Sequence, residues 1–320
     1  MTEPITWTLR LASGGQIDLP QPVGWRLEYG LGSPCDSFWV KFLWSDGRED
    51  LLAEGYRMAV TRGGETLFFG VVDECRCQWS REGCTAELTG RGMQALLLDN
   101  QAEAADFDRA TLEDVLRRYV TPYGIQVAGA DPLPAVDGFS VASGSSCWKV
   151  LYQFARYHGG VTPRFDRRGR LDLRDWADGD PLVVDAAAPV TGLTLSRRRY
   201  GVLSRVTVKD VSGWERGTAV NRTFEAQGGQ ATRVILVPRN TGYQAKRYNA
   251  KFQLERSWAK SRQVELTLAL PFAAWPGDLV LLARPGWSQN GKYRVQESRV
   301  RLGERGVETT LTLGYTYAVL

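Results

Sequence analysis

Apolar and polar side chains alternate along most of the first hundred residues. Five segments show this alternation: residues 7–11, 25–29, 38–44, 56–61 and 67–79. A period of two is typical of a strand that buries one face and exposes the other. Glycines between the segments supply the positive φ that a tight reversal needs. We therefore expect an antiparallel β-domain, closed by one buried helical turn in residues 91–100.

The pattern changes to a helical period in the middle of the chain. An apolar stripe follows Thr111 and ends near Pro122, and the acids after Thr111 are typical of a capped helix N-terminus. A second helix is expected to begin at Ser145 or Ser146. Residues 161–176 then form a hairpin around an Asp-Arg-Arg-Gly turn. Two helices with a small sheet indicate an α+β module.

Strand-like alternation returns from about residue 190. It covers residues 191–196, 203–208, 232–237 and 264–269, and leads into a block of strands at 277–315. The polar stretch between these strands contains a moderate helical pattern at 241–258. Residues 212–230, rich in Gly, Thr and Gln, are predicted to form a long loop.

Two segments more than two hundred residues apart repeat each other. Residues 72–89 align without a gap on residues 295–312, at a constant separation of 223 positions. Identical residues occupy six pairs of positions: 72/295 (Val), 74/297 (Glu), 76/299 (Arg), 83/306 (Gly), 88/311 (Leu) and 89/312 (Thr). A separation of 222 extends the match upstream to Gly55/Gly277, Arg62/Arg284 and Gly64/Gly286. Chance convergence of two hairpins is the alternative, but a tandem pair of like β-domains explains the repeat better.

These patterns together predict a mainly β fold with an α+β insert. We expect two similar antiparallel β-barrel-like domains, at residues 1–100 and 191–320. They flank a small α+β middle domain at residues 101–190. A chain of 320 residues is long enough for three such cores.

The composition and net charge say little about binding partners. The chain has 34 Gly and 11 Trp, which suits a turn-rich β protein, and its net charge of +4 is too small to indicate nucleic acid as the main partner. The first residues lack the features of a signal peptide, and the longest aliphatic run, 279–283, is too short to span a bilayer. We expect a soluble chain that folds in a cytosol and does not enter a membrane.

No group of residues predicts catalysis or a cofactor. The one histidine, His158, is expected at a helix C-terminus, where an imidazolium suits the helix dipole. The acid pairs Asp172/Asp175 and Asp178/Asp180 lie in or beside a hairpin, where acids commonly form turns. The tryptophans are spread along the chain, so core and interface roles are favoured over stacking of sugars or bases.

The five cysteines are expected to be reduced thiols. An odd number in a chain without an export signal argues against a disulfide framework. Cys75, Cys77 and Cys84 lie near one hairpin, with the first two on one strand face, but no fourth ligand has a usable spacing for zinc. We therefore predict no metal site.

Three segments together resemble the tail hub proteins of contractile phages, the family that includes late control protein D and the hub half of type VI secretion spikes. The first is LFFGVVDECRCQWSREGCTAELTGRGMQALLLDN (67–100), which is similar to the end of the first hub domain. The second is SGSSCWKVLYQFARYHGGVTPRFDRRGRLDLRDW (143–176), which looks like the hub middle segment. The third is WPGDLVLLARPGWSQNGKYRVQESRVRLGERGVETTLTLGY (275–315), which resembles the last β-domain. Their order carries the resemblance, because no single motif is diagnostic.

The resemblance implies a structural baseplate hub with two tail-tube-like domains per chain. In such hubs a homotrimeric ring presents six similar β-units, so that a sixfold tail tube and a threefold spike can bind opposite faces. The implied partners are the tube protein, a trimeric spike protein, and the tape measure or other baseplate proteins, with DNA passing only transiently through the lumen. The implied location is the bacterial cytoplasm during assembly and then the baseplate of a virion, bacteriocin or injection system.

Residues of the repeat are the predicted ring or subunit interface. We expect blocks 55–90 and 277–313 to line the ring, with contacts that close between neighbouring copies. The residues assigned to this interface are Val72, Glu74, Arg76, Leu88, Val295, Glu297, Arg299 and Leu311. Two other functions remain open: a carbohydrate- or oligonucleotide-binding double β-barrel, and a peptidoglycan hydrolase of the tail tip.

Overall fold

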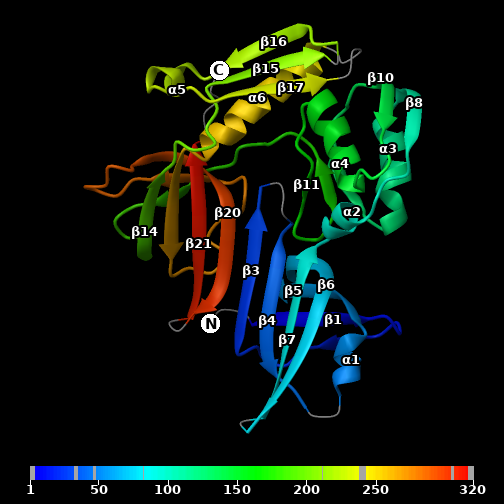
Figure 1. The fold of residues 1–320 in the computed structure, drawn as a ribbon. Helices are drawn as coiled ribbons and strands as arrows, with labels where there is room; N and C mark the ends of the chain where they lie inside the picture. The colour runs from blue at the N-terminus through cyan, green and yellow to red at the C-terminus, as the bar shows by residue number, and fades with distance from the viewer. Residues whose placement is uncertain are drawn as a thin grey trace.

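The structure is a computed structural model. It describes residues 4–31, 35–45, 48–81, 83–210, 212–237, 243–303 and 306–315. Figure 1 shows two β-units side by side, with an α+β module and a smaller α/β unit at one end of them.

The first β-unit is an antiparallel sheet that curls over its own core. Its strands are β1 (Ile5–Leu11), β2 (Gln16–Asp18), β3 (Gly24–Gly30), β4 (Ser37–Leu43), β5 (Gly55–Arg62), β6 (Glu65–Ser80) and β7 (Gly83–Gly92), with helix α1 (Glu49–Ala53) before β5. Their order across the sheet is β3-β4-β7-β6-β5-β1-β2. The Trp7 ring of β1 lies 6.1 Å from that of Trp25 and 6.3 Å from that of Phe38, so β1 packs across the sheet onto β3 and β4. The expected strands and the barrel-like curl are confirmed.

The second β-unit repeats this strand order. Its strands are β13 (Leu182–Val184), β14 (Val190–Arg197), β18 (Arg262–Leu268), β19 (Leu279–Leu282), β20 (Gly291–Gly303) and β21 (Gly306–Tyr315). The order β14-β18-β21-β20-β19-β13 matches β3-β4-β7-β6-β5-β1 strand for strand. Only the last pair differs, because β13 runs parallel to β19 whereas β1 runs antiparallel to β5.

The repeated segments adopt the same hairpin. Both hairpins carry a β-bulge at the repeated position, since the pairing register shifts within residues 72–74 of the first and within residues 295–297 of the second. The last pair joins residues 80 and 83 in one hairpin and residues 303 and 306 in the other. The pairing also explains why the separation changes from 223 to 222 upstream. Residue 57 faces residue 71 in the first unit, and residue 279 faces residue 294 in the second. Residues 71 and 294 are 223 positions apart, whereas their partners 57 and 279 are 222 apart. Two identical bulges in identical registers support duplication over convergence.

One continuous sheet joins the two units. The second half of β20 pairs antiparallel with β3, with Glu297 opposite Gly30 and Val300 opposite Leu27. We call this pairing the β3–β20 junction. Val300 has no exposed surface and belongs to the core of the first unit, so the two units pack as well as pair at the junction.

The middle segment forms the expected α+β module. Its elements are α2 (Ala95–Asp99), β8 (Ala105–Ala110), α3 (Leu112–Tyr119), η1 (Thr121–Tyr123), β9 (Val127–Ala130), β10 (Val136–Val141), α4 (Cys147–Tyr152), η2 (Gln153–His158), β11 (Arg164–Phe165) and β12 (Leu171–Leu173). Thr111 caps α3 in a capping box with Asp114, and Ser146 caps α4 through a 3.2 Å hydrogen bond from the Lys149 N–H to its Oγ. The hairpin β11–β12 is also confirmed. Strands β8, β9 and β10 were not predicted.

A small α/β unit inside the last third of the chain corrects the loop expected at 212–230. It contains β15 (Arg205–Asp210), β16 (Glu215–Val220), α5 (Arg222–Ala226), β17 (Thr232–Val237) and α6 (Tyr243–Ala259). Strand β16 pairs with β15, and α5 is capped by Asn221 and buries Phe224. The segment looked like a loop because β16 is a polar edge strand with an internal glycine, Gly217. The backbone of β16 pairs with β15 although the β16 sequence has no alternation of apolar and polar residues.

Candidate assembly interface

One face of the continuous sheet packs against the cores and the opposite face is polar. Strand after strand buries every second side chain, for example Leu27 and Val40, and turns the intervening ones outward. We call the outward side the polar face. Its residues include Glu265, Thr310, Thr312, Glu297, Arg299, Arg301, Arg26, Glu28, Ser37, Trp39, Lys41, Glu87, Glu74, Arg76 and Gln78.

The eight residues predicted at the interface divide between these two faces. Leu88, Val295 and Leu311 have no exposed surface and lie in the unit cores, and Val72 packs half-buried against the first core. The other four lie on the polar face: Glu74 and Arg76 on β6, and Glu297 and Arg299 on β20. Of the eight, these four are the side chains that face outward from the cores.

The bulges cause this division. Residues two apart in a regular strand point to the same side, so Val72 and Glu74 would share a face. The bulge at residues 72–74 adds one residue and reverses the alternation, as does the bulge at 295–297. The interface prediction rests on identity between the repeated segments, which does not distinguish core from surface residues, and a period-of-two pattern cannot locate the reversal.

An ion-pair cluster crosses the β3–β20 junction on the polar face. The Nε of Arg299 donates to Oε1 of Glu28 at 2.6 Å, and Ser37 Oγ donates to the other carboxylate oxygen at 3.1 Å. Arg26 lies 3.4 Å from the same carboxylate. Partial burial alone would raise the pKa of Glu28, but the hydrogen bond and charge of Arg299, with Arg26 and Ser37, lower it. The cluster therefore stays charged at neutral pH and links residues that are 271 positions apart.

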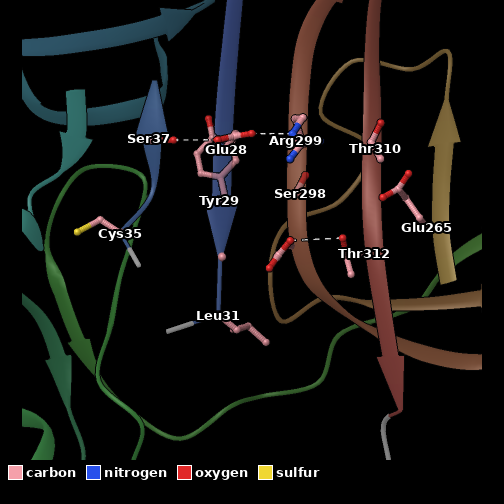
Figure 2. A pocket seen from close by; sticks show the side chains of 12 residues that line it. Glu28, Tyr29, Leu31, Cys35, Ser37, Glu265, Ser298, Arg299, Thr310 and Thr312 are labelled. Atoms are coloured by element: carbon pink, nitrogen blue, oxygen red, sulfur yellow. Dashed lines mark hydrogen bonds and ion pairs between the residues drawn. The ribbon is translucent and has the colours of Figure 1, made fainter. Parts of the chain in front are cut away.

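A shallow hollow of about 250 Å³ lies over this cluster. Figure 2 shows Glu28, Arg299, Thr312 and Glu265 pointing into it from β3, β20, β21 and β18. Most of the side chains that line it are hydroxyl or charged groups that already bond to one another, for example Thr312 Oγ1 to Glu297 Oε2 at 3.5 Å, and Leu31 and Cys35 complete the lining. Such a surface suits contact with water or with a passing polymer better than tight capture of a small molecule.

A second hollow, of about 280 Å³, lies where β3 meets the middle module and the 275–278 turn. The Arg167 guanidinium lies 4.3 Å from the centre of the Trp275 ring, and Trp275 packs edge-on against Tyr29 at 4.9 Å. Asp36 lines the same hollow and accepts a 3.1 Å hydrogen bond from the Gly30 N–H. Burial raises the pKa of Asp36 to about 7, although that hydrogen bond favours the carboxylate.

The acids and the histidine that were considered for catalysis contact neighbouring side chains of the fold. Burial would raise the pKa of Asp172, but bonds from Arg174 and the charge of Arg164 lower it, and Asp178 pairs with Arg294 at 2.8 Å. Burial lowers the pKa of His158, whose ring packs edge-on against Phe139. Packing against Phe139 of β10 thus disfavours the imidazolium that the helix C-terminus would favour.

The five cysteines are not joined by disulfides. Cys75 and Cys77 lie on one strand face and pack against the first core. Burial raises the pKa of Cys75 to about 11 and that of Cys35 to about 12, so both are protonated and poorly nucleophilic at neutral pH. Within the described ranges, no three His, Cys, Asp or Glu side chains are grouped so that they could hold a metal ion. In the same part of the chain no helix has the length and apolarity to cross a bilayer.

Comparison with known proteins identifies a family model and a fold. Residues 95–175 match the model of the second domain of gp44-like baseplate hub proteins. A tail protein of Neisseria meningitidis superposes with a TM-score of 0.79 at 16% identity, covering 98% of each chain. The 43 kDa tail protein of prophage MuSo2 from Shewanella oneidensis gives a TM-score of 0.74 at 16% identity, covering 96% of this chain and 98% of the other.

More distant structures extend the fold to secretion systems. An E. coli protein described as a type VI secretion component, with structural similarity to T4 tail proteins gp27 and gp5, gives a TM-score of 0.55 at 12% identity. The match covers 93% of this chain and 76% of that one. No curated protein sequence matches significantly. Together the matches confirm the resemblance that the three sequence segments indicate.

Proposed function

We propose that this chain, a phage tail protein with a gp44-like baseplate hub domain at residues 95–175, is the structural hub of a contractile tail or a related injection system. Three copies form a ring that joins a sixfold tail tube to a threefold spike. The ring assembles in the bacterial cytoplasm and is then part of the tail particle.

The observation that carries this proposal is the duplicated β-unit. Two units with the same strand order, the same hairpin and the same bulge lie side by side in one sheet. Three such chains arranged in a ring present six nearly equivalent units. A sixfold partner can therefore bind a threefold ring without breaking its own symmetry.

The two ends of the molecule support the assignment of opposite partners. The hairpins β6–β7 and β20–β21 point toward the same end of the sheet in Figure 1, with Ser80 paired with Gly83 and Gly303 with Gly306 as their last described pairs. The α+β module and the α/β unit lie at the other end, and each occurs once per chain. The hairpin end thus offers six similar elements for the tube, and the opposite end offers only threefold elements for the spike. Contacts with the tape measure or other baseplate proteins belong to these same ends.

The polar face suits the wall of a lumen. Acids and bases alternate on it and pair with one another, as Lys41 does with Glu87 at 2.9 Å. A lumen with paired charges attracts the DNA backbone weakly, so DNA can pass without being held. The hub in this proposal has no catalytic role and requires no cofactor.

The size of the particle in solution tests the proposal. We expect purified protein at high concentration to contain an annular trimer with three times the 35.7 kDa mass of one chain, measured by native mass spectrometry and electron microscopy. A monomer that binds an oligosaccharide or an oligonucleotide would support a binding module instead. Lysis of cell walls by the protein would support a tail-tip hydrolase.

A further inference from the structure

A buried amide without a partner lines the second hollow, the one of about 280 Å³ between β3, the middle module and the 275–278 turn. Gln94 is 6% exposed, and within the described part of the chain its Nε2 has no hydrogen-bond partner. An unpaired buried donor destabilises a fold. Its place beside a hollow therefore indicates that a ligand group supplies the missing hydrogen bond.

Two more groups at this hollow have unused hydrogen-bonding capacity. Among the described residues, the Gly30 N–H is the donor to the Asp36 carboxyl. Because burial raises the pKa of Asp36 to about 7, this carboxyl can donate when protonated and accept when ionised near neutral pH. Arg167 uses one Nη to bond Glu65 at 2.5 Å, and its guanidinium has further N–H groups. The hollow thus offers donors together with one group that can donate or accept.

The charges around the hollow favour an uncharged ligand. Acids and bases both line it: Asp36, Asp166, Asp278, Arg164 and Arg167. Three of these already have partners, since Asp166 accepts from Arg170, Asp278 accepts from the Trp275 N–H, and Arg164 pairs with Asp172. A ligand of either charge would face groups of its own sign, which weakens binding.

The tryptophan rings at the hollow are packed over their faces. The Arg167 guanidinium lies over Trp275, and Phe272 stacks on the same ring at 5.6 Å with an interplanar angle of 24°. The Arg164 guanidinium lies 4.3 Å from the centre of the Trp176 ring. These contacts cover faces on which a sugar or a base would stack. The rings therefore serve as apolar walls.

The second hollow continues into the hollow on the polar face. Tyr29, Gly30 and Leu31 line both, and Figure 2 shows Tyr29 and Leu31 at the end of β3 beside the first hollow. A Cβ at Gly30 would meet no heavy atom within 4 Å, so the space over this residue is open. An extended chain can therefore pass from one hollow to the other.

We propose that the second hollow binds an extended, uncharged peptide segment of another protein. A peptide group of that segment accepts from the Gln94 amide and donates to the Asp36 carboxyl. An apolar side chain beside it lies against Pro163 and Pro276, since apolar and aromatic walls are typical of grooves that bind peptides. The segment then continues over Gly30 onto the polar face. All of these groups belong to one chain, so the site does not depend on the proposed ring.

Fluorine NMR of the full-length protein labelled with 5-fluorotryptophan tests the site. The probe is the blocked peptide acetyl-Ala-Pro-Ala-Ala-Pro-Ala-amide, and the variants Trp176→Phe and Trp275→Phe assign the two resonances that report on the hollow. We expect both resonances to shift with a dissociation constant on the order of 1 mM, because a short probe makes few contacts. Chitotetraose, an uncharged sugar that also carries secondary amides, is the comparison. Tighter binding of the sugar than of the peptide would overturn the proposal.

A substitution at Gly30 tests the path between the hollows. Gly30→Val places a side chain in the open space without a positive φ to strain it, so we expect probe affinity to fall at least about tenfold with no loss of melting temperature. Gly15→Val is the matched control, because Gly15 lies between β1 and β2, outside both hollows, and a Cβ there would have Leu11 as its nearest contact at 3.8 Å. Unchanged affinity in Gly30→Val would overturn the path.

Gln94→Met separates a binding role from a structural one. Removal of an unpaired buried amide should raise the melting temperature, while the loss of its hydrogen bond to the probe should weaken binding about five- to tenfold. A lower melting temperature with unchanged probe affinity would show that the amide serves the fold, and would overturn the proposal. So would the absence of any shift at probe concentrations tenfold above about 1 mM. Neither result bears on the ring, which the mass in solution tests separately.

Discussion

Asp36 is a carboxylic acid whose ionisation is coupled to folding. Burial raises its pKa to about 7, whereas an unfolded Asp titrates near about 3.9. The folded state therefore holds this proton more tightly than the unfolded state. The contribution of Asp36 to stability is most favourable below about pH 4 and is lost progressively as the pH rises to about 7.

The variant Asp36→Asn should remove this pH dependence. The amide oxygen can still accept from the Gly30 N–H, but it carries no charge. We expect the melting temperature of the variant to exceed that of the original protein at pH 8 and to approach it at pH 4, as measured by thermal unfolding. Parallel pH profiles for the two proteins would show that Asp36 ionises freely in the folded state.

Gly277 is a residue at which space and backbone both demand glycine. Its φ is +98°, and a Cβ there would lie 2.0 Å from the Trp176 ring. Gly286 has a similar φ of +81° but no heavy atom within 4 Å of a Cβ. We expect Gly286→Ala to cost about 1–2 kcal/mol from the backbone alone. Gly277→Ala should cost about 1–3 kcal/mol more because of the clash. Equal losses in chemical denaturation would mean that Trp176 moves aside freely.

At the scale of elements, the two hairpins β6–β7 and β20–β21 organise the β-units. Leu88 and Leu311 hold the same place in them and are fully buried. We expect Leu88→Asp or Leu311→Asp to abolish folding, because the free-energy cost of burying an unpaired carboxylate exceeds the free energy of unfolding of a typical domain. Circular dichroism and yield of soluble protein measure this. Normal trimers from both variants would count strongly against the assigned core.

At the scale of the whole molecule, assembly should depend on surface groups that folding does not need. Leu302, the counterpart of Trp79 in the second hairpin, packs against the first core, whereas Trp79 itself is 56% exposed. We therefore expect Trp79 to contact a neighbouring copy in the proposed ring, and Trp79→Glu to reduce the trimer fraction with little change in the melting temperature of the monomer. Trp214→Glu is the matched control, since Trp214 is 70% exposed and lies in the α/β unit and not in either β-unit. Native mass spectrometry compares the two, and an equal loss of trimer in both would contradict the assigned contact.

The division of the chain into residues 1–100, 101–190 and 191–320 remains a proposal at this scale. The described residues form four separate core clusters, and one of them, around Val206 and Leu254, belongs to the α/β unit within the last segment. The middle core also includes Val71 of β6, so the module and the first β-unit share packing. Limited proteolysis would show which boundaries separate stable pieces.

The sequence by itself determined the repeat, the strands and helices with strong periodicity, and the capped ends at Thr111 and Ser146. These follow from local pattern and from hydrogen bonds between residues close in the chain, which need no knowledge of distant partners. The tertiary structure alone decided which strands meet and which face each side chain occupies. The bulges at 72–74 and 295–297 reverse the alternation, and β16 forms by pairing with β15 despite its polar sequence. Backbone pairing between distant strands leaves no periodic pattern in the sequence, so the β3–β20 junction became visible only in the fold.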